Sequence, residues 1–300
     1  MQMSYHSAVL LKESVDGLDI KPDGVYVDVT FGGGGHSREI LKRLGKEGRL
    51  FAFDQDKDAL KNTIDDERFV LINENFRFIK RFLRLNGFKK VDGILADLGV
   101  SSHQFDVAER GFSTRFDADL DMRMNQDDAK SAFDIINYYD EVDLAKILFE
   151  YGELRGSRGI AAKIVEAREE KKIKTSFQLK EVLQQFLPKA KEHKILAQIF
   201  QAVRIEVNEE LDALKEFLMQ TVGLLDEGGK LSVISYHSLE DRLVKRLIQK
   251  GMFEGEPERD FYGNFTVPFK KDGKLIVPTS DQIKENNRAR SAKLRVAFRI

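Results

Sequence analysis

The chain contains no cysteine among its 300 residues. This absence excludes disulfide bridges, thiolate zinc sites and a cysteine nucleophile, and it fits a reducing compartment. The five histidines include no pair at the spacing of metal ligands, so we predict no structural metal. No apolar run approaches the roughly 18 residues that a transmembrane helix needs. The N-terminal segment lacks the charged start and apolar core of a secretory signal, and we expect a cytoplasmic location.

The chain also lacks an excess of either positive or negative charge, since its net charge is only −1. No overall electrostatic field therefore draws it to nucleic acid. Locally, the stretch from Arg288 to the end is basic and contains no acid. Such a patch either binds phosphate or forms a solvated face. Hydrophobic residues make up 42% of the chain and charged residues 33%, which is typical of a globular protein with a sizeable core.

The first hundred residues alternate between strand and helix patterns. Short apolar runs rich in β-branched residues predict buried strands within 24–31, 49–56, 69–76 and 91–99, each followed by helical spacing. Strands that alternate with helices in this way indicate parallel crossovers. The sequence therefore predicts an open α/β sheet of the Rossmann-like kind.

This alternation stops at about residue 106. Residues 106–203 show apolar residues at three- and four-residue spacing, with helices predicted in EVDLAKILFEYGE, GIAAKIVEAREEKK, SFQLKEVLQQFL and KILAQIFQAVRI. After it come a helix at 208–225, a strand at 230–238, a helix, and two final strands in NFTVPF and KLRVAFRI. Residues 254–287 read mostly as a long irregular connection. We predict a core of residues 1–105 and 204–300 with a helical insertion at 106–203.

A glycine cluster follows the first predicted strand, in the segment from Asp28 to His36. Glycines allow a sharp turn and a close approach of backbone amides to a ligand. A dinucleotide fingerprint needs a third glycine where Ser37 stands. Instead, Asp28 lies four residues before Gly32, and this spacing resembles motif I of class I methyltransferases. The ligand there carries an ammonium group, which an acid or backbone carbonyls can hold.

Two further positions favour S-adenosylmethionine over a nicotinamide dinucleotide. Asp54 ends the second predicted strand, roughly 20 residues beyond the glycines, where an acid accepts both ribose hydroxyls. Asp56 competes for this role because it faces the same way in an extended chain. Phe76 ends the third predicted strand, where a ring borders the adenine or simply packs in the core.

The motifs as a set resemble one known family. In chain order they are HSAVLL, DVTFGGGGHS, ADLGVSSHQFD, ERGFS, LDMRM, FQAVRIEVNEEL, SYHSLEDRLVK and RARSAKLR. The chain resembles the bacterial 16S ribosomal RNA cytosine-N4 methyltransferases, the RsmH or MraW family, along nearly its whole length. The resemblance implies a class I methyltransferase sheet with an inserted helical domain, and S-adenosylmethionine as the cofactor.

The resemblance also implies roles for particular residues in the cofactor pocket. Gly34, Gly35 and His36 would contact the amino-acid end of the cofactor, Asp54 would bind the ribose, and Phe76 would lie against the adenine.

The resemblance further implies that Asp97 lines the pocket near the methyl group and that Gln104 closes over the cofactor. The exocyclic amine of cytosine is a poor nucleophile, so a carboxylate that accepts its hydrogen bond would help the transfer. Asp97 is our candidate, although the Pro-Pro-aromatic motif of many amino-methyltransferases does not follow it, and its role is either catalytic or limited to cofactor binding. His237 either has a role in the reaction, in which it orients the base or takes the released proton, or it is a structural residue that caps the next helix.

The insertion and the basic C-terminus together are the expected surface for ribosomal RNA. Arginines interleaved with Phe112 and Phe116 open the insertion, and such a pattern suits phosphate contact and base stacking. The alternative is a packed core with surface arginines. The candidate RNA-binding residues are Arg110, Arg115, Arg123, Arg288, Arg290 and Lys293. We expect the small ribosomal subunit as partner, with the chain either a monomer or a homodimer.

Three other functions remain open at this stage. The chain could methylate another RNA or DNA base, or it could bind S-adenosylmethionine as a non-catalytic factor in ribosome assembly. A nicotinamide dehydrogenase is a third alternative, which Ser37 and Asp28 disfavour.

Overall fold

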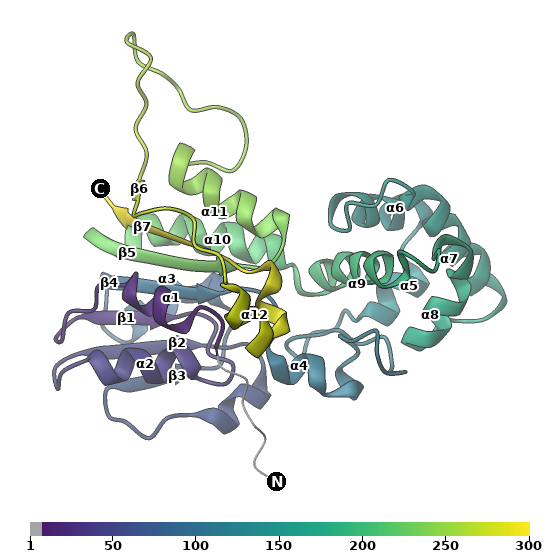
Figure 1. The fold of residues 1–300 in the computed structure, drawn as a ribbon, viewed down its shortest axis with the longest axis horizontal. Coiled ribbons are helices and arrows are strands. Elements are labelled where there is room, and N and C mark those ends of the chain that lie inside the picture. Colours follow the sequence, from purple (N-terminus) through teal and green to yellow (C-terminus); the bar gives the residue numbers. More distant parts are fainter. Residues whose placement is uncertain (1–7) are drawn as a thin grey trace. The chain divides into compact units, whose positions relative to one another are not determined.

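The computed structural model describes residues 8–300, which form two compact units (Figure 1). The first unit, the sheet unit, contains the described residues up to Gly99 and Leu211–Ile300. The second, the helical unit, is Val100–Glu210. The boundaries thus lie a few residues outside 106 and 203. His6 and Ser7, which begin the HSAVLL motif, lie outside the described residues.

The sheet unit is built on seven strands in the order β3-β2-β1-β4-β5-β7-β6 (Figure 1). Strands β1 to β5 pair in parallel, whereas β7 runs antiparallel to both β5 and β6. The parallel α/β sheet expected from the sequence is confirmed, but the reversed direction of β7 was not foreseen. The strands are β1 Val25–Asp28, β2 Arg49–Phe53, β3 Phe69–Ile72, β4 Val91–Asp97, β5 Leu225–Ser235, β6 Phe269–Lys271 and β7 Lys293–Arg299.

Helices cover both faces of this sheet. Successive strand residues alternate between two clusters, so Val27 and Phe51 pack in one and Tyr26 and Leu50 in the other. This explains why the strands read as continuous apolar runs. One face is covered by α1 Leu11–Asp16 and α2 Gly35–Arg43, and the other by α3 Ile79–Leu85, α10 Glu210–Leu224 and α11 Ser238–Lys250.

The carboxyl ends of the parallel strands meet at one edge of the sheet, where ligands bind in such folds. At this edge Asp28 and Asp97 are the last residues of β1 and β4, and Asp54 and Tyr236 directly follow β2 and β5. The stretch after β2 that was expected as an α-helix is the 3₁₀ helix η1 Lys57–Asn62 instead, whereas the helix expected after β3 is confirmed as α3, preceded by the 3₁₀ turn η2 Phe76–Phe78.

The connection after α11 is largely irregular, as the sequence predicted, and includes β6 and α12 Ser280–Glu285. The strand predicted in NFTVPF is wrong for all but Phe269. Pro268 has no N–H to donate to a ladder, and Asp260 instead closes a turn by accepting from the N–H groups of Tyr262 (2.9 Å) and Asn264 (2.7 Å). Within residues 8–300, no helix combines the length and apolar character needed to cross a bilayer.

The helical unit packs its helices around one apolar core that includes Leu144, Ile160 and Ile199. The four helices predicted here are confirmed. Two further helices, α4 and α5, were missed, although capping boxes mark their starts, at Ser101 and Gln104 for α4 and at Ser131 and Asp134 for α5. The helices are α4 Ser102–Asp106, α5 Ala132–Tyr138, α6 Glu141–Glu150, α7 Ser157–Glu170, α8 Ser176–Val182 and α9 Glu192–Asn208, with 3₁₀ turns η3 Ala108–Arg110 and η4 Gln184–Phe186.

Candidate active site

The glycine cluster forms the turn from β1 into α2. Gly34 is the N-cap of α2 and has a φ of +74°, a conformation that side-chain-bearing residues rarely adopt. A β-carbon at Gly34 would lie 2.8 Å from Nη1 of Arg38 and 2.9 Å from the ring of Phe31. Gly35 is similarly confined, because its β-carbon would lie 2.9 Å from that of Ala8. The turn therefore requires glycine at both positions.

Asp28 holds this turn from inside. Its side chain is fully buried, and its Oδ2 accepts from Oγ of Ser37 (2.7 Å) while Oδ1 accepts from the N–H of Thr30 (3.1 Å). The same Ser37 that breaks the dinucleotide fingerprint thus ties the first turn of α2 to the end of β1. Asp28 shapes the backbone that would receive a ligand, and its oxygens face other protein groups.

Asp54 comes directly after β2 and remains partly exposed at the sheet edge. Its Oδ2 accepts from the N–H of Gly32 (2.7 Å), and its Oδ1 accepts from the N–H of Asp56 (2.9 Å). Burial raises the pKa of Asp54 to about 6, and the two N–H donors oppose that shift only in part. The carboxylate therefore joins the glycine turn to the end of β2.

Asp56, the competing acid, has a different position. It is only 4% exposed, and its Oδ1 accepts from the N–H of Asp58 (3.0 Å) as the N-cap of η1. Of the two acids, Asp54 is the more exposed and Asp56 is a helix cap, and the contact of Asp54 with a ribose stays a prediction.

Phe76 lies just after β3, at the start of η2. Its partly buried ring packs edge-on against Phe217 of α10, with 5.3 Å between ring centroids. Asn75 fixes the start of η2 by accepting from the N–H of Arg77 (2.9 Å). The ring is thus anchored on one side by core packing, and its contact with adenine stays a prediction.

Asp97 ends β4 and is held by three neighbouring segments. Its N–H donates to Oγ1 of Thr30 (2.6 Å), its Oδ1 accepts from Oη of Tyr236 (2.7 Å), and its Oδ2 lies 3.9 Å from Nδ1 of His36. The side chain is 22% exposed. Burial raises the pKa of Asp97 to about 6, against the opposing effects of His36 and the Tyr236 hydroxyl. Near neutral pH the group is therefore an ionised but poorly solvated acceptor.

His36 links this carboxylate to the glycine turn. It is the second residue of α2 and only 4% exposed, and its Nε2 lies 3.3 Å from the carbonyl oxygen of Val9. The structure therefore brings together Gly34, Gly35, His36 and Asp97, although they come from two separate motifs.

Tyr236 is the residue of this edge that sequence reasoning missed. It follows β5 directly, and the signal was present because an aromatic hydroxyl precedes His237 in the SYHS motif. Burial and the nearby Asp97 carboxylate raise the pKa of Tyr236 well above its ordinary value, so the phenol stays protonated and donates.

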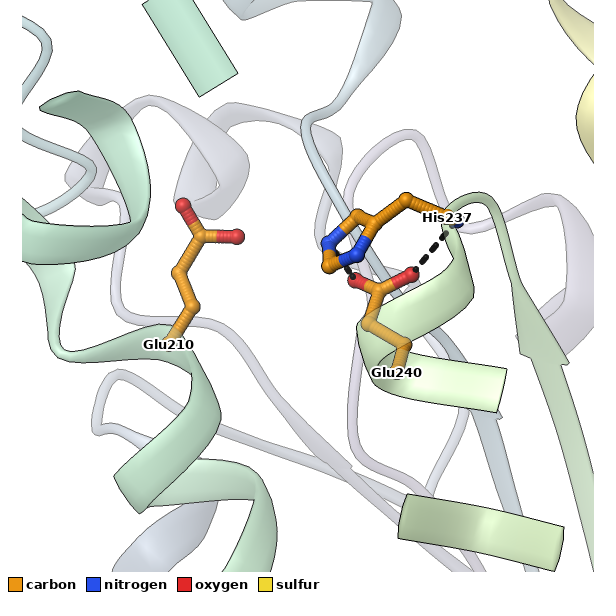
Figure 2. A group of neighbouring side chains, drawn as sticks. All are labelled: Glu210, His237 and Glu240. Carbon is orange, nitrogen blue, oxygen red and sulfur yellow. Dashed lines mark hydrogen bonds and ion pairs between the residues drawn. The ribbon is translucent and has the colours of Figure 1, made fainter. Parts of the chain in front are cut away.

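His237 is the N-cap residue of α11, and Figure 2 shows its ring beside Glu240. Its Nε2 lies 3.2 Å from Oε1 of the buried Glu240, whose Oε2 accepts from the N–H groups of Tyr236 (2.8 Å) and His237 (3.3 Å). The position matches the capping alternative, and the catalytic role of His237 stays a prediction. Glu210, also drawn in Figure 2, belongs to the helical unit and pairs there with Arg204 (2.8 Å).

Gln104 belongs to the helical unit and is only 4% exposed. It forms a capping box at the start of α4, where its Oε1 accepts from the N–H of Ser101 (3.0 Å) and its N–H donates to Oγ of Ser101 (3.2 Å). These contacts give Gln104 a structural role in α4, and closure over the cofactor stays a prediction.

The arginines that open the helical unit differ in their surroundings. Arg110 is 5% exposed and donates to the carbonyl oxygens of Arg123 (2.9 Å) and Met124 (3.0 Å), and Arg123 forms a two-point ion pair with Asp121 (2.7 and 2.9 Å). By contrast, Arg115 is exposed and Phe116 is 47% exposed. Phe112, expected as a possible stacking ring, is buried in the core.

The C-terminal basic residues lie in the sheet unit. Arg288 and Arg290 are in η5 Asn287–Ser291, and Arg290 is exposed. Lys293 begins β7, and its Nζ lies 3.4 Å from Oδ2 of Asp241. Asp241 also pairs with Arg295 (2.7 Å), so this part of the basic stretch is partly neutralised.

A parallel sheet that reverses only at its seventh strand, with the glycine turn and two strand-end acids along one edge, is the architecture of the Rossmann-like class I methyltransferases. The expected fold class is confirmed.

Comparisons with known proteins identify the family within the class I methyltransferases to which the chain belongs. Residues 3–300 match the model of the MraW methylase family. Among curated relatives, a Flavobacterium johnsoniae protein named "Ribosomal RNA small subunit methyltransferase H" is 68% identical over 298 residues, covering 99% of both chains. Proteins of the same name are 65% identical in Christiangramia forsetii, over 99% of both chains, and 54% identical in Bacteroides fragilis, over 99% of this chain and 98% of that one. The chain therefore belongs to the MraW methylase family and is an enzyme, a methyltransferase.

Proposed function

We propose that this enzyme transfers a methyl group from S-adenosylmethionine to N4 of a cytidine in 16S ribosomal RNA. The observation that carries the proposal is the match along 99% of the chain to relatives named for methylation of small-subunit ribosomal RNA. This match favours ribosomal RNA over the DNA, dehydrogenase and non-catalytic alternatives. We further propose the cytoplasm as its location, since ribosomal RNA is there, and a substrate already within the small subunit.

The sheet edge suits S-adenosylmethionine. Side chains at Gly34 and Gly35 would collide with neighbouring atoms, so the turn keeps its backbone close to any ligand in front of it. Asp54 presents a partly exposed carboxylate one residue beyond β2, where a ribose is bound in this fold class. Gly34, Gly35 and His36 would hold the amino-acid end, Asp54 the ribose and Phe76 the adenine.

When bound, S-adenosylmethionine supplies an electrophilic methyl group on a sulfonium sulfur. The chain must then improve a weak nucleophile, because the lone pair of the cytosine amine is delocalised into the ring. Asp97 would accept a hydrogen bond from that amine and concentrate electron density on the nitrogen. With a pKa of about 6, Asp97 is ionised and able to accept at neutral pH.

The RNA would be held by basic and aromatic groups that the fold leaves open. Arg115 and Phe116 in the helical unit suit phosphate contact and base stacking, and Arg290 offers an exposed charge in the sheet unit. Arg110 and Arg123 are engaged within their own loop, and we leave them out of the proposed surface. A paired target base would have to be flipped out of its helix.

The proposal is tested by transfer of a labelled methyl group. The substrates are small ribosomal subunits from a strain that lacks this enzyme, naked 16S RNA and duplex DNA. Digestion to nucleosides and mass spectrometry should identify N4-methylcytidine from the subunits. Label in another nucleoside would replace the assigned base, and label in DNA alone would contradict the RNA substrate.

A further inference from the structure

We propose that Tyr236 is a positioning residue that fixes the Asp97 carboxylate, so that its Oδ2 faces the substrate amine. This inference rests on the proposed function, because it concerns how the acceptor of that reaction is aligned. Tyr236 itself touches neither the reacting nitrogen nor the methyl group in this account.

The tyrosine is held at three points. Its hydroxyl donates to Oδ1 of Asp97 (2.7 Å), and its N–H donates to Oε2 of Glu240 (2.8 Å). Its ring lies over Gly99, where a β-carbon would come within 3.5 Å of Cδ2. Gly99 also has a φ of +93°, which glycine adopts without strain. The buried Glu240 thus fixes the backbone of Tyr236, and the hydroxyl carries that constraint to Asp97.

This arrangement distinguishes the two oxygens of Asp97. Oδ1 receives the tyrosine hydroxyl, whereas Oδ2 lies 3.9 Å from Nδ1 of His36, beyond hydrogen-bond distance. The N–H of the same residue donates to Thr30, which fixes the main chain below the carboxylate. With one hydrogen bond already accepted by Oδ1 and the main chain held, Oδ2 keeps more acceptor capacity for an amine than Oδ1.

Tyr236 also affects when this carboxylate is ionised. The charged or titratable groups facing Asp97 are His36 on α2, Tyr236 directly after β5, Glu240 in the first turn of α11, and Asp28 at the end of β1. Burial, Asp28 and Glu240 raise the pKa of Asp97, whereas His36 and the Tyr236 hydrogen bond lower it. Because the phenol donates to the ionised form, removing it favours the protonated carboxyl.

The test compares the wild-type chain with Tyr236→Phe, which keeps the ring and removes only the hydroxyl. The main readout is the titration of the Asp97 carboxyl by ¹³C nuclear magnetic resonance, assigned by the signal missing in Asp97→Asn. We expect the Asp97 pKa to rise by about one pH unit in Tyr236→Phe. Tyr262→Phe, at an 84% exposed ring, is the matched control and should leave the titration unchanged.

Activity and binding complete the test. At saturating cofactor, the acid limb of the single-turnover rate should shift upward by the same amount, and the rate at pH 6 should fall about fivefold, because the ionised fraction of Asp97 falls by that factor when its pKa rises from about 6 by one unit. Affinity for S-adenosylhomocysteine should change less than about twofold. Because Asp54 also has a pKa of about 6, the rate alone would not identify the group, and the resonance titration does.

A second variant of the chain keeps the proposal testable if Tyr236→Phe does not fold. If Tyr236→Phe does not fold, 3-fluorotyrosine in place of Tyr236 keeps the ring and makes a stronger donor, so the Asp97 pKa should fall. An unchanged titration in the folded variant, or an equal rate loss at every pH with weakened S-adenosylhomocysteine binding, would overturn the proposal. Failure of the wild type to methylate ribosomal RNA would refute the proposed function instead, while the titration would still report on Tyr236.

Discussion

The strand-end acids of the sheet unit and the arginines that open the helical unit are both charged residues beside glycine-containing loops, yet they are used differently. Asp54 and Asp97 each bond to neighbouring segments and still keep part of the carboxylate exposed at the sheet edge. Arg110 and Arg123 direct their guanidinium groups to acceptors of their own loop. A charged side chain thus stays partly exposed at the sheet edge where neighbouring segments hold it in place.

This difference between the acids and the arginines follows from how each backbone satisfies its hydrogen bonds. In the sheet, strand pairing already satisfies most main-chain groups, so the few N–H donors left at the edge orient the acids without enclosing them. The loop from Val107 to Lys130 has little regular hydrogen bonding, and its buried carbonyls need other donors. Arg110 supplies two of these donors. Sequence alone gives the charge of such a residue, and the surrounding backbone determines its use.

The largest effect that would test this contrast is expected from Asp97→Asn. The amide oxygen can still accept from Tyr236, but the side chain has no charge to place before the substrate amine. Turnover should fall by roughly 10²- to 10⁴-fold, the range for loss of a group that acts in the transition state. Methyl transfer to small ribosomal subunits measures the rate, and calorimetry with S-adenosylhomocysteine should show nearly unchanged affinity. Wild-type turnover would remove Asp97 from the mechanism.

The next effect is on stability and concerns Arg110→Ala. The substitution leaves the carbonyls of Arg123 and Met124 without their donor, so unfolding of the helical unit should become easier by roughly 2–4 kcal/mol. Chemical denaturation together with hydrogen exchange of the unit gives the value. Arg115→Ala, at an exposed neighbour in sequence, is the control and should stay within about 0.5 kcal/mol. Equal losses in the two variants would contradict a structural role particular to Arg110.

Much of the sheet unit was predictable because its elements follow local rules. The strands β1 to β4 and the glycine turn were read from apolar runs and residue spacing, and Asp54 and Asp97 were found as acids at strand ends. The antiparallel β7 was not foreseen, because strand direction depends on long-range pairing with β5. Tyr236 was missed for the same reason, since its partner Asp97 is 139 residues away.

Functional assignments were harder wherever two roles use the same residue type. Asp54 and Asp56 look alike in sequence. They differ in the structure because Asp56 is buried and caps η1 by accepting from the N–H of Asp58. Likewise, the RNA-binding potential of Arg110 and Arg115 looks equal until one is found buried and the other exposed. Local sequence patterns place such residues on a loop, but they do not show which side chains must donate hydrogen bonds to the backbone of that loop.

A smaller effect is expected for the basic stretch of the sheet unit. Arg290→Glu should weaken RNA binding about tenfold at low salt and reduce the slope of log affinity against log salt by roughly 0.7 or more, since a phosphate contact becomes repulsive. Lys293→Glu should do less, because Asp241 already offsets the charge of Lys293. Binding of 16S RNA fragments over a salt series measures both slopes. An unaltered slope in both variants would place the RNA elsewhere.

The smallest predicted effect is on the pH dependence of cofactor affinity, which should reflect the carboxylates of the sheet edge and not the arginines. Because burial raises the pKa of Asp54 to about 6, the group gains a proton as pH falls through that value and loses an acceptor for the ribose. Affinity for S-adenosylhomocysteine should therefore be constant above pH 7 and fall by about fivefold to tenfold at pH 5. Calorimetry over this range measures it, with Asp54→Asn as the comparison, in which affinity should be weaker and flatter with pH. An equal decline in Asp54→Asn would assign the titration to another group. Arginine charges do not change in this window, so a loss of cofactor affinity that tracks Asp54 would show that the sheet edge, and not the basic surface, carries the pH response.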